Sequence, residues 1–483
     1  MKYCKFLQFF WYRHFTKGDD AMNTAVDIGF ELKMSSKKDY IENFDQKFDA
    51  VFDVIDLPSL SLFEIIEKIK SLTFSVDSDL VQIISQMKLD YIASEPSCSC
   101  CGSRMHKKYT RRKEVETTIG SMRFDCPYLF CPKCKAHHTP HEDILNLRPG
   151  KYQYDVQKVT ALLSSKDTYE ESADMLNEIY RFGISPDTVH HLAGEVASRV
   201  NMVEIIPSPD EVRKIVEQIS ANQHRKPIFV FAADGAMAPI RTEEKGVANC
   251  WKEVKGIRGY LLDKKQIVHL FSWHQISDKA EFASYLQHVK EQGLIPLDKV
   301  RLCFIGDGAG WIWDTVQAVF PDCRQVLDYF HCAQHLHDFA HIQFGQNTQA
   351  REWVEQAKVR LFHNNITGVL IGLNNLKCRT VEAQKARAKL VGYLKGNKKR
   401  IDYGKLRRGG YPLGSGAIES ANKFICHVRL KRSGAWWKID NANNVLKLRC
   451  AKYNAKFDDV FEMHEAVNRK QPQHSAVALK RIK

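Results

Sequence analysis

The pattern of apolar and polar residues divides this chain of 483 residues into stretches of different character. Apolar residues three and four positions apart in SLFEIIEKIKSLT and SDLVQIISQMKLDYI predict helices within residues 22–90. Residues 96–141 are bracketed by cysteines and rich in basic and β-branched residues, whereas residues 153–200 carry the pattern of three helices with short breaks. The first half of the chain therefore predicts small modules rather than one large core.

From residue 228 onward the pattern predicts alternating strands and helices. IFVFAAD, WKEVKGIRGYLL and QIVHLFSW indicate strands, AEFASYLQHVKEQ a helix, RLCFIGD a strand, DTVQAVF a helix and RQVLD a strand. This order is typical of a mixed α/β sheet. Residues 330–405 predict helices almost throughout, and a last helix is expected to start near Ser415. The predicted fold class is therefore multidomain α/β.

Composition and charge narrow the class of protein. The length alone predicts about two to four domains. Lys and Arg number 71 against 57 Asp and Glu, an excess that favours a polyanionic partner such as DNA. No run of eighteen apolar residues predicts a transmembrane helix. Residues 1–21 are apolar and basic like a signal peptide, but no cleavage site follows their apolar run. They are therefore expected to be a disordered tail, or to precede a true start at Met22. The expected location is the cytoplasm.

Two CxxC pairs predict a zinc site. Cys98 and Cys101 precede Cys131 and Cys134, with two predicted strands, KEVETTIG and MRFDCPYLF, between the pairs. Two such turns supply four thiolates for one tetrahedral Zn²⁺, the arrangement of a structural zinc ribbon. Four unlinked thiols or a redox pair are the alternatives, and a histidine could replace one cysteine. The candidates for that replacement are His137, His138 and His141. Three basic residues of the module could contact phosphates or form a solvated charge run: Arg111, Arg112 and Lys113.

The stretch YEESADMLNEIYRFGISPDTVHHLAGEVASRV predicts a helix-turn-helix. Gly183 breaks the first helix, and Ser185 with Pro186 opens the second as N-cap and first-turn residues. Two helices joined by a short turn with Gly have the shape of a DNA-binding motif, although ordinary helical hairpins look the same. The second helix would offer four residues to the major groove, Asp187, Thr188, His190 and His191.

Three acidic residues form the candidate catalytic set. Asp234 and Asp307 each end an apolar run and precede a glycine, and Glu419 lies in GSGAIESANK at the start of the last helix. Two carboxylates at neighbouring strand ends are costly unless a cation compensates them. Two Mg²⁺ or Mn²⁺ ions on such oxygens suit phosphoryl displacement. Each Asp-Gly taken singly is also a common turn.

These motifs resemble the DDE transposases of bacterial insertion sequences, most closely the ISKra type, over residues 90–455. The resemblance rests on the four cysteines followed by YEESADML, SPDTV, DGAMAPIR, WKEVKG, GDGAGWIW, FPDCRQVLDYFH, LGSGAIES and RLKRSGAWW. It implies an RNase H-like domain with a helical insertion, and Asp234, Asp307 and Glu419 as the metal-binding triad. The first ninety residues carry no matching motif.

The resemblance also assigns supporting residues. It implies that Asp328 and His331 support the site or contact the cleaved phosphate; His335, one turn further, is placed with them, and direct metal ligation and a purely structural role stay open. In RLKRSGAWW, cations interleaved with tryptophans suit phosphate contacts and base stacking, unless the tryptophans are core and the cations a solvated face. The residues concerned are Arg429, Lys431, Arg432, Trp436 and Trp437.

The expected protein is a transposase that binds the terminal repeats of its element, cuts and joins DNA, and acts as a dimer or larger assembly at the bacterial nucleoid. Rival readings are an RNase H-like nuclease that does not join, a silent transposase-derived repressor, and a zinc-ribbon adaptor between proteins. The predicted parts are a tail and helical segment (1–90), a zinc ribbon (91–145), a helix-turn-helix region (150–205), a catalytic domain (225–329 and 413–455), a helical insertion (330–412) and a basic tail (456–483).

Overall fold

The structure is a computed structural model that describes residues 41–42, 45–46, 66, 70, 76–85, 88–89, 97–221, 224–242, 248–264 and 266–468. The chain divides into two units, Met1–Glu95 and Pro96–Lys483. In the first unit, 76–85 and 88–89 are helical and overlap the predicted SDLVQIISQMKLDYI helix, which starts at Ser78. The predicted tail 1–21 and nearly all of SLFEIIEKIKSLT lie outside the described residues. In the described part of the chain, no helix is long and apolar enough to cross a membrane.

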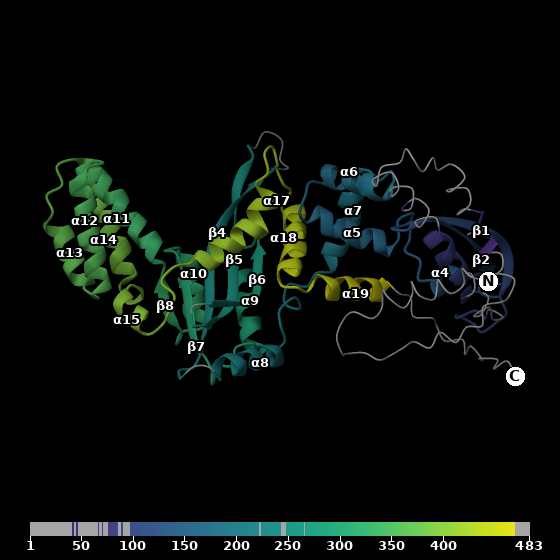
Figure 1. The fold of residues 1–483 in the computed structure, drawn as a ribbon, viewed down its shortest axis with the longest axis horizontal. Coiled ribbons are helices and arrows are strands. Elements are labelled where there is room, and N and C mark those ends of the chain that lie inside the picture. Colours follow the sequence, from purple (N-terminus) through teal and green to yellow (C-terminus); the bar gives the residue numbers. More distant parts are fainter. Residues whose placement is uncertain are drawn as a thin grey trace. The chain divides into compact units, whose positions relative to one another are not determined.

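The second unit begins with a β-hairpin between the two CxxC pairs (Figure 1). Strands β1 (His106–Thr117) and β2 (Gly120–Phe130) pair antiparallel, β3 (His137–His138) adds to β2, and α4 (Pro140–Ile144) follows. Alternate residues such as Val115, Met122 and Phe124 are buried, which gives the hairpin one apolar face. Both predicted strands are confirmed, and β1 begins seven residues earlier than predicted.

Three helices follow as the pattern predicts, α5 (Tyr154–Ser164), α6 (Tyr169–Tyr180) and α7 (Pro186–Arg199). Thr168 and Glu171 form a capping box at the start of α6, and the Ser185 hydroxyl accepts from Thr188 N at 3.2 Å. Apolar residues from all three helices, including Leu176, Val189 and Leu192, form their common core. Helix α8 (Pro209–Ser220) then leads to the central sheet.

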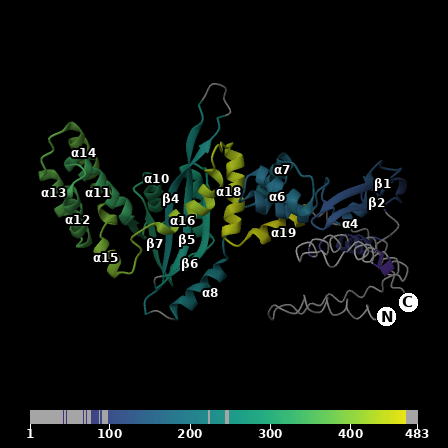
Figure 2. The same cartoon turned by 45° about the horizontal axis from the view of Figure 1, so that its top comes forward.

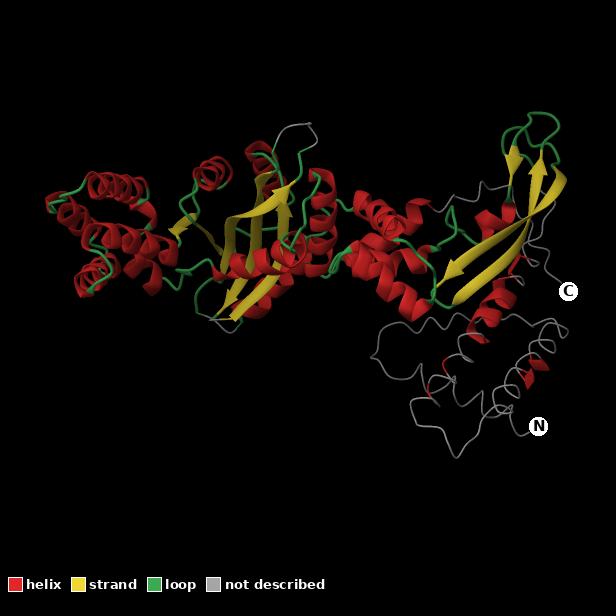
Figure 3. Cartoon of the chain, turned by 90° about the horizontal axis from the view of Figure 1, so that it is seen from above, coloured by secondary structure: helices red, strands yellow, loops and turns green. Residues whose placement is uncertain are grey.

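The central sheet has five strands in the order β6-β5-β4-β7-β8. Figure 3 draws its strands in yellow among the red helices. The strands are β4 (Ile228–Ile240), β5 (Cys250–Asp263), β6 (Gln266–Gln275), β7 (Arg301–Gly306) and β8 (Arg324–Leu327). Neighbours are antiparallel from β6 to β4 and parallel from β4 to β8. Helix α9 (Lys279–Glu291) connects β6 to β7, and helix α10 (Gly310–Val319) connects β7 to β8. All seven predicted elements of this region are confirmed.

After β8 the chain becomes helical, as predicted for 330–405 (Figure 2). The helices are α11 (Tyr329–Phe344), α12 (Thr348–Phe362), α13 (Ile366–Asn375), α14 (Val381–Gly396) and α15 (Tyr403–Arg408), with a 3₁₀ turn at Lys398–Arg400. Helix α11 packs against α12 and α14, and the 3₁₀ turn contacts β8. These helices share one apolar core with the sheet.

The last helices bring the chain back across the sheet. Helix α16 (Gly416–Ala421) contacts β4 and β5 and continues through a π-helical turn (Asn422–His427) into α17 (Val428–Leu430). Helix α18 (Ile439–Tyr453) packs on β6 and α7, and α19 (Phe457–Asn468) follows. Between α17 and α18, Trp437 O accepts from Arg241 N at 2.8 Å, which extends the edge of β4. The chain therefore places the helix of Glu419 against β4, the strand that carries Asp234, and against β5.

Candidate active site and zinc site

Strand register brings three aspartates together. Ala233 of β4 is level with Gly306 of β7, and Gly306 is level with Leu327 of β8. The residue that follows each of these is an aspartate: Asp234, Asp307 and Asp328. Neighbouring parallel strands lie about 4.8 Å apart, so the backbones of the three aspartates lie side by side at one level of the sheet. The juxtaposition of Asp234 and Asp307 expected from the two apolar runs is therefore present.

Gly235 and Gly308, which follow Asp234 and Asp307, make room for neighbouring side chains. Strand β4 continues to Ile240, so Asp234 lies within the strand rather than at its end, and Gly235 makes no turn. A Cβ on Gly235 would lie 2.3 Å from Glu253 Oε1 of β5, and one on Gly308 would lie 2.4 Å from the Tyr393 ring. Both glycines are required for close approach of a neighbouring side chain.

Asp234 is held in a crowded acidic environment. Gly235 N donates to its Oδ1 at 2.8 Å and Asn422 Nδ2 to its Oδ2 at 2.9 Å. Burial first, then the negative charges of Asp307 and Glu419, raises the pKa of Asp234 to about 6. A divalent cation would relieve this repulsion, because it stabilises the charged carboxylates. The electrostatics of the donor set therefore fit a cation.

Glu419 completes the set from the helix above. It is exposed on α16, and the Ser415 hydroxyl donates to its Oε1 at 3.5 Å. Asp307 is fixed differently, since its Oδ1 accepts from Ala309 N at 2.9 Å. The carboxylate oxygens of Asp234, Asp307 and Glu419 are spaced more widely than the sulfur atoms of the four cysteines. Among the described residues, only the cysteine cluster has its ligand atoms within 4.8 Å of one another.

Asp328 ties the strands to the helix of Glu419. It is fully buried; its Oδ1 accepts from His331 N at 2.7 Å, capping α11, and its Oδ2 accepts from Ser415 N. Because Asp328 is fully buried, whereas Asp234 is partly exposed, Asp328 is placed to support the site rather than to bind a cation itself. This geometry favours the supporting role among the three alternatives for this residue.

The two histidines of α11 face the same region. His331 is half-buried, and its positive charge lowers the pKa of Asp234, opposing the acidic neighbours. His335 packs on Tyr393 with ring centroids 4.2 Å apart, and burial lowers its pKa. Tyr393 in turn lies against Gly308. His331 is therefore near the carboxylates, whereas His335 packs against the wall beside Asp307.

Two residues of the site were not predicted. Asn422 donates to Asp234, and His274 Nε2 lies 3.0 Å from Asn422 Oδ1, fully buried, where burial lowers the pKa of His274 to about 3. A signal for Asn422 exists in the sequence, because it follows Glu419 by three positions and therefore shares its helix face. His274 lies at the end of an apolar strand and gives no comparable signal.

The raised pKa predicts a pH-dependent strain. The folded protein holds the Asp234 proton up to a pH of about 6, whereas the unfolded chain releases it near 3.8. The stability contributed by this group is therefore present below pH 4 and lost as the pH rises to about 6. Without divalent cations, we expect the free energy of unfolding of Asp234→Asn to rise by about 1–3 kcal/mol relative to that of the wild type between pH 4 and pH 7. Urea unfolding of both proteins measures this; a difference that does not change with pH would contradict it.

The four cysteines form a cluster that could bind zinc. Their sulfur atoms all lie within 4.8 Å of one another; Cys98 Sγ is 3.3 Å from Cys134 Sγ and Cys101 Sγ is 3.6 Å from Cys131 Sγ. Tetrahedral Zn–S bonds of about 2.3 Å require sulfur separations of this size. The cluster needs no histidine: His138 pairs with Asp143 and His141 bonds to Asp125 O.

The two knuckles have the same backbone geometry. Cys98 O accepts from Gly102 N at 2.8 Å, and Cys131 O accepts from Lys135 N at 2.9 Å. Gly102 and Lys135, each directly after the second cysteine of its pair, have φ of 66° and 62°. Hydrogen bonds from Ser103 lower the pKa of Cys101 to about 6, which favours the thiolate that a metal requires. The repeated geometry explains why all four sulfurs point to one centre.

The predicted DNA-contacting residues of the first modules differ in accessibility. Arg111 and Arg112 are exposed on β1, whereas Lys113 is buried against Arg148 O and Glu142. In α7, Thr188 bonds to the N-cap Ser185, His190 packs on Tyr169, and His191 is exposed. Of the four predicted contact residues of this helix, Asp187 and His191 are therefore the exposed ones.

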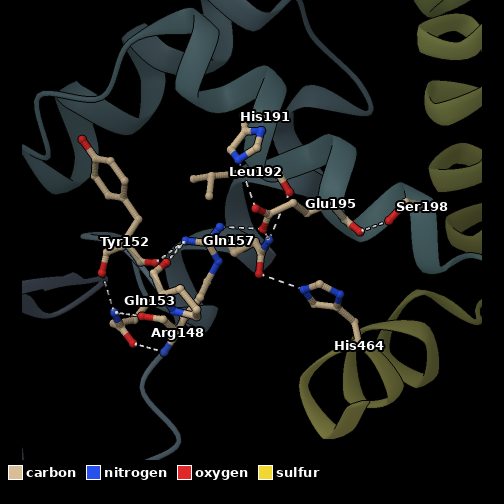
Figure 4. Close-up of polar contacts among 11 residues, drawn as sticks. Arg148, Tyr152, Gln153, Gln157, His191, Leu192, Glu195, Ser198 and His464 are labelled. Atoms are coloured by element: carbon tan, nitrogen blue, oxygen red, sulfur yellow. Dashed lines mark hydrogen bonds and ion pairs between the residues drawn. The ribbon is translucent and has the colours of Figure 1, made fainter. Parts of the chain in front are cut away.

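A buried polar network anchors α7 (Figure 4). Glu195 Oε2 accepts from Arg148 Nη2 at 2.5 Å and Gln157 Nε2 at 2.7 Å, and Gln157 Oε1 lies 3.0 Å from His464 Nε2. Glu195 Oε1 pairs with His191 at 3.1 Å. The network joins the segment after the zinc module to α5, α7 and α19, so the predicted helix-turn-helix is fixed to the C-terminal helix.

The RLKRSGAWW segment divides into core and surface. Arg429 is buried between the Trp437 and Tyr169 rings, 4.6 and 5.0 Å from their centroids, and Trp437 is buried with it. Arg432 pairs with Asp167 and Glu171. Lys431 and Trp436 are exposed, and Trp436 lies beside the exposed Trp251. In this structure, Arg429 and Trp437 are part of the core, so of this segment Lys431 and Trp436 are the accessible members.

Comparison with known proteins adds little. No protein-family model matches the sequence, and no curated protein matches it. A solved structure that is similar is the Drosophila P element transposase strand transfer complex, with 11% sequence identity and a TM-score of 0.25 over 67% of this chain and 83% of that chain.

Proposed function

We propose that this protein is a DDE-type DNA transposase that cuts and joins DNA at the ends of an insertion sequence of the ISKra type. The observation that carries the proposal is the register of β4 and β7, which sets Asp234 beside Asp307 beneath the helix of Glu419. The mutual repulsion of these carboxylates fits a site that holds divalent cations. The mixed sheet, with both aspartates on its central parallel pair, supports an RNase H-like catalytic domain.

The proposed chemistry is phosphoryl transfer in two steps. Two Mg²⁺ or Mn²⁺ ions on Asp234, Asp307 and Glu419 would activate an attacking oxygen and stabilise the leaving one. In the first step a water attacks a phosphodiester at the element's end, and the broken P–O bond leaves a free 3′-hydroxyl. In the second, that hydroxyl attacks a phosphodiester of the target, so one bond forms for each that breaks and no ATP is needed.

The protein's own residues position this reaction. Asp328 fixes the start of α11 to the loop before Glu419 through its two N–H partners. That contact sets His331 near the carboxylates, where its imidazole can contact the cleaved phosphate. The zinc module and the helices α6 and α7 would bind the terminal repeats, with Arg111, Arg112 and His191 as their accessible polar residues. Pairing two ends would require a dimer or larger assembly.

A basic helix borders the candidate site and suits a DNA backbone. Residues 377–408 contain twelve Lys and Arg against two Asp and Glu. Helix α14 places Tyr393 against Gly308, next to Asp307, and the charge of Lys389 reaches His335. Lys385 and Lys389, one turn apart on α14, are exposed. A phosphate backbone on this helix would lead directly to the carboxylates.

We therefore expect Lys385→Glu with Lys389→Glu to weaken DNA binding. The loss should be about 10- to 100-fold at about 100 mM salt, and the slope of log affinity against log salt should fall by about 2, because two phosphate contacts are lost. Fluorescence anisotropy over a salt series measures both quantities. Lys214→Glu, an exposed lysine of α8, is the matched control. An unchanged slope in the double variant would remove α14 from the DNA path.

A joining assay tests the proposal against its rivals. A duplex that already ends in the element's 3′-hydroxyl is incubated with the protein, Mg²⁺ and a supercoiled plasmid. A transposase joins the duplex to the plasmid, whereas a nuclease of the same fold cuts DNA and yields no joined product. A silent DNA-binding repressor binds the end and yields neither. A protein that binds no DNA at all would favour the zinc-ribbon adaptor.

A further inference from the structure

We propose that Asn422 and His274 are positioning residues for Asp234: together they fix the direction in which its carboxylate presents its lone pairs to a divalent cation. The inference rests on the proposed function, because it deepens the role of the same site. Neither residue is expected to touch the reacting phosphate; both act through Asp234.

The relay spans three neighbouring strands and the helix above them. Strand register places Asp234 of β4 opposite Gly256 of β5, and Gly256 opposite His274 of β6. Asn422, directly after α16, bridges the two ends: its Nδ2 is 2.9 Å from Asp234 Oδ2 and its Oδ1 is 3.0 Å from His274 Nε2. The chain of contacts therefore crosses the sheet over Gly256.

Gly256 is the residue that makes room for the bridge. A Cβ at this position would lie 2.7 Å from the His274 ring and 3.0 Å from Asn422 Oδ1. Any side chain here would separate His274 from Asn422, or push Asn422 off Asp234. The glycine in WKEVKG thus has a spatial reason tied to the relay, since its φ is not in the left-handed region.

The hydrogen-bond chemistry allows one assignment of the donors. An ionised carboxylate only accepts, so Asn422 must turn its NH₂ toward Asp234 and its Oδ1 toward His274. His274 must then donate from Nε2, which leaves Nδ1 as the unprotonated nitrogen of a neutral ring. Nδ1 is buried and has no hydrogen-bond partner among the described residues, which costs less for an unprotonated nitrogen than for an N–H. The imidazole therefore locks the amide of Asn422 against flipping.

The lock has two consequences for a cation site. Each oxygen of Asp234 receives one N–H, from Gly235 and from Asn422, so its remaining lone pairs point in fixed directions. Asn422 also clamps its helix to β4 three residues after Glu419, which fixes the separation of the two carboxylates. Partners that orient a ligand in this way typically raise metal affinity about 10- to 100-fold.

The test measures Mn²⁺ binding directly, with the cysteine site kept saturated with Zn²⁺. Free Mn²⁺ is counted by electron paramagnetic resonance for the wild type and for Asn422→Leu, His274→Leu, His274→Gln and the double Leu variant. We expect each Leu variant to bind Mn²⁺ about 10- to 100-fold more weakly, and the double variant to lose no more than Asn422→Leu alone, because both act through one contact. His274→Gln keeps a donor and should recover most of the affinity.

A stability measurement separates positioning from a structural role. His274→Leu leaves the buried Oδ1 of Asn422 without its donor, so both its stability and its Mn²⁺ affinity should fall. Asn443→Leu is the control: Asn443 also anchors the end of β6, through Ile276, and should lose stability but not Mn²⁺ binding.

The outcomes are distinguishable. A folded Asn422→Leu or His274→Leu protein with wild-type Mn²⁺ affinity would overturn the inference and leave the proposed function standing. If Asn422→Leu does not fold, equal affinities of His274→Leu and His274→Gln would overturn it in the same way. A wild-type protein that binds no Mn²⁺ would overturn both the inference and the proposed function.

Discussion

Glu419→Gln is expected to lower metal-dependent cleavage of the element's end by about 10³-fold or more, with little change in binding to the same DNA. The substitution keeps the size and hydrogen-bonding shape of the side chain and removes the negative charge that a cation would require. Losing one preorganised electrostatic contact in a phosphoryl- or acyl-transfer site costs about 10²–10³-fold in rate, and losing a metal ligand costs more. The measurement is single-turnover cleavage of a labelled duplex beside an anisotropy titration.

The position of Glu419 makes this a sharp comparison. It is exposed on α16, so the substitution leaves the core intact. Glu352→Gln, an exposed glutamate of α12, removes the same charge elsewhere and should cut like the wild type. Cleavage by Glu419→Gln at the wild-type rate would show that Glu419 is not part of the site, and loss of both cutting and binding would indicate a structural role instead.

Cys131→Ser is expected to abolish zinc binding and to unfold the zinc module, residues 97–138. Structural Zn²⁺ in zinc-finger peptides contributes about 10–16 kcal/mol at pH 7, so losing one of four thiolates removes most of what holds such a module. Cys131 is buried, and its backbone closes the second knuckle through Ala136 and Lys135. We expect the zinc content to fall from one ion per chain to near zero, and the 97–138 hairpin to become sensitive to proteolysis.

Cys100→Ser is the control for this experiment. Cys100 lies inside the first knuckle, next to Cys101, but is exposed and outside the cluster of four sulfurs. Its replacement should leave the zinc content unchanged. Full zinc content in Cys131→Ser would mean that the metal, if bound, is held by another set of residues. DNA binding by the zinc-free protein would show that the module stabilises the chain without contacting the DNA.

The order of strands and helices from residue 228 to β8 could be predicted because local signals agreed with the tertiary structure, whereas α18 and α19, after the expected last helix near Ser415, were not predicted. Apolar runs such as IFVFAAD and RLCFIGD form strands buried on both faces, and every predicted element of this region is present. Helix α8 was missed, although Ser208 and Glu211 form a capping box that marks its start. The end of β4 was also misplaced, because its extension to Ile240 depends on pairing with distant residues of β5 and with Trp437.

The candidate site was predictable where one residue type carries the chemistry. Carboxylates that follow apolar runs predict that they lie together at the sheet, and paired cysteines predict that their sulfur atoms share one metal. Asn422 and His274 could not be found this way, because their role depends on register across three strands. Arg429 and Trp437 show the opposite limit, because a cation next to an aromatic ring suits a DNA contact and a packed core equally well. Here Arg429 packs between two rings in the core. Which outcome holds is decided by packing against Tyr169, which is 260 residues away in sequence.

The most direct test of the account is whether the purified protein nicks its own element. An intact labelled duplex carrying the terminal repeat is incubated with Mg²⁺ and the wild type, beside Asp307→Ala. The account predicts a nick at the end of the element that leaves a 3′-hydroxyl, requires the divalent cation and is absent from the Asp307→Ala reaction. Tight, specific binding of the wild type without any nick would contradict it and favour a silent DNA-binding protein.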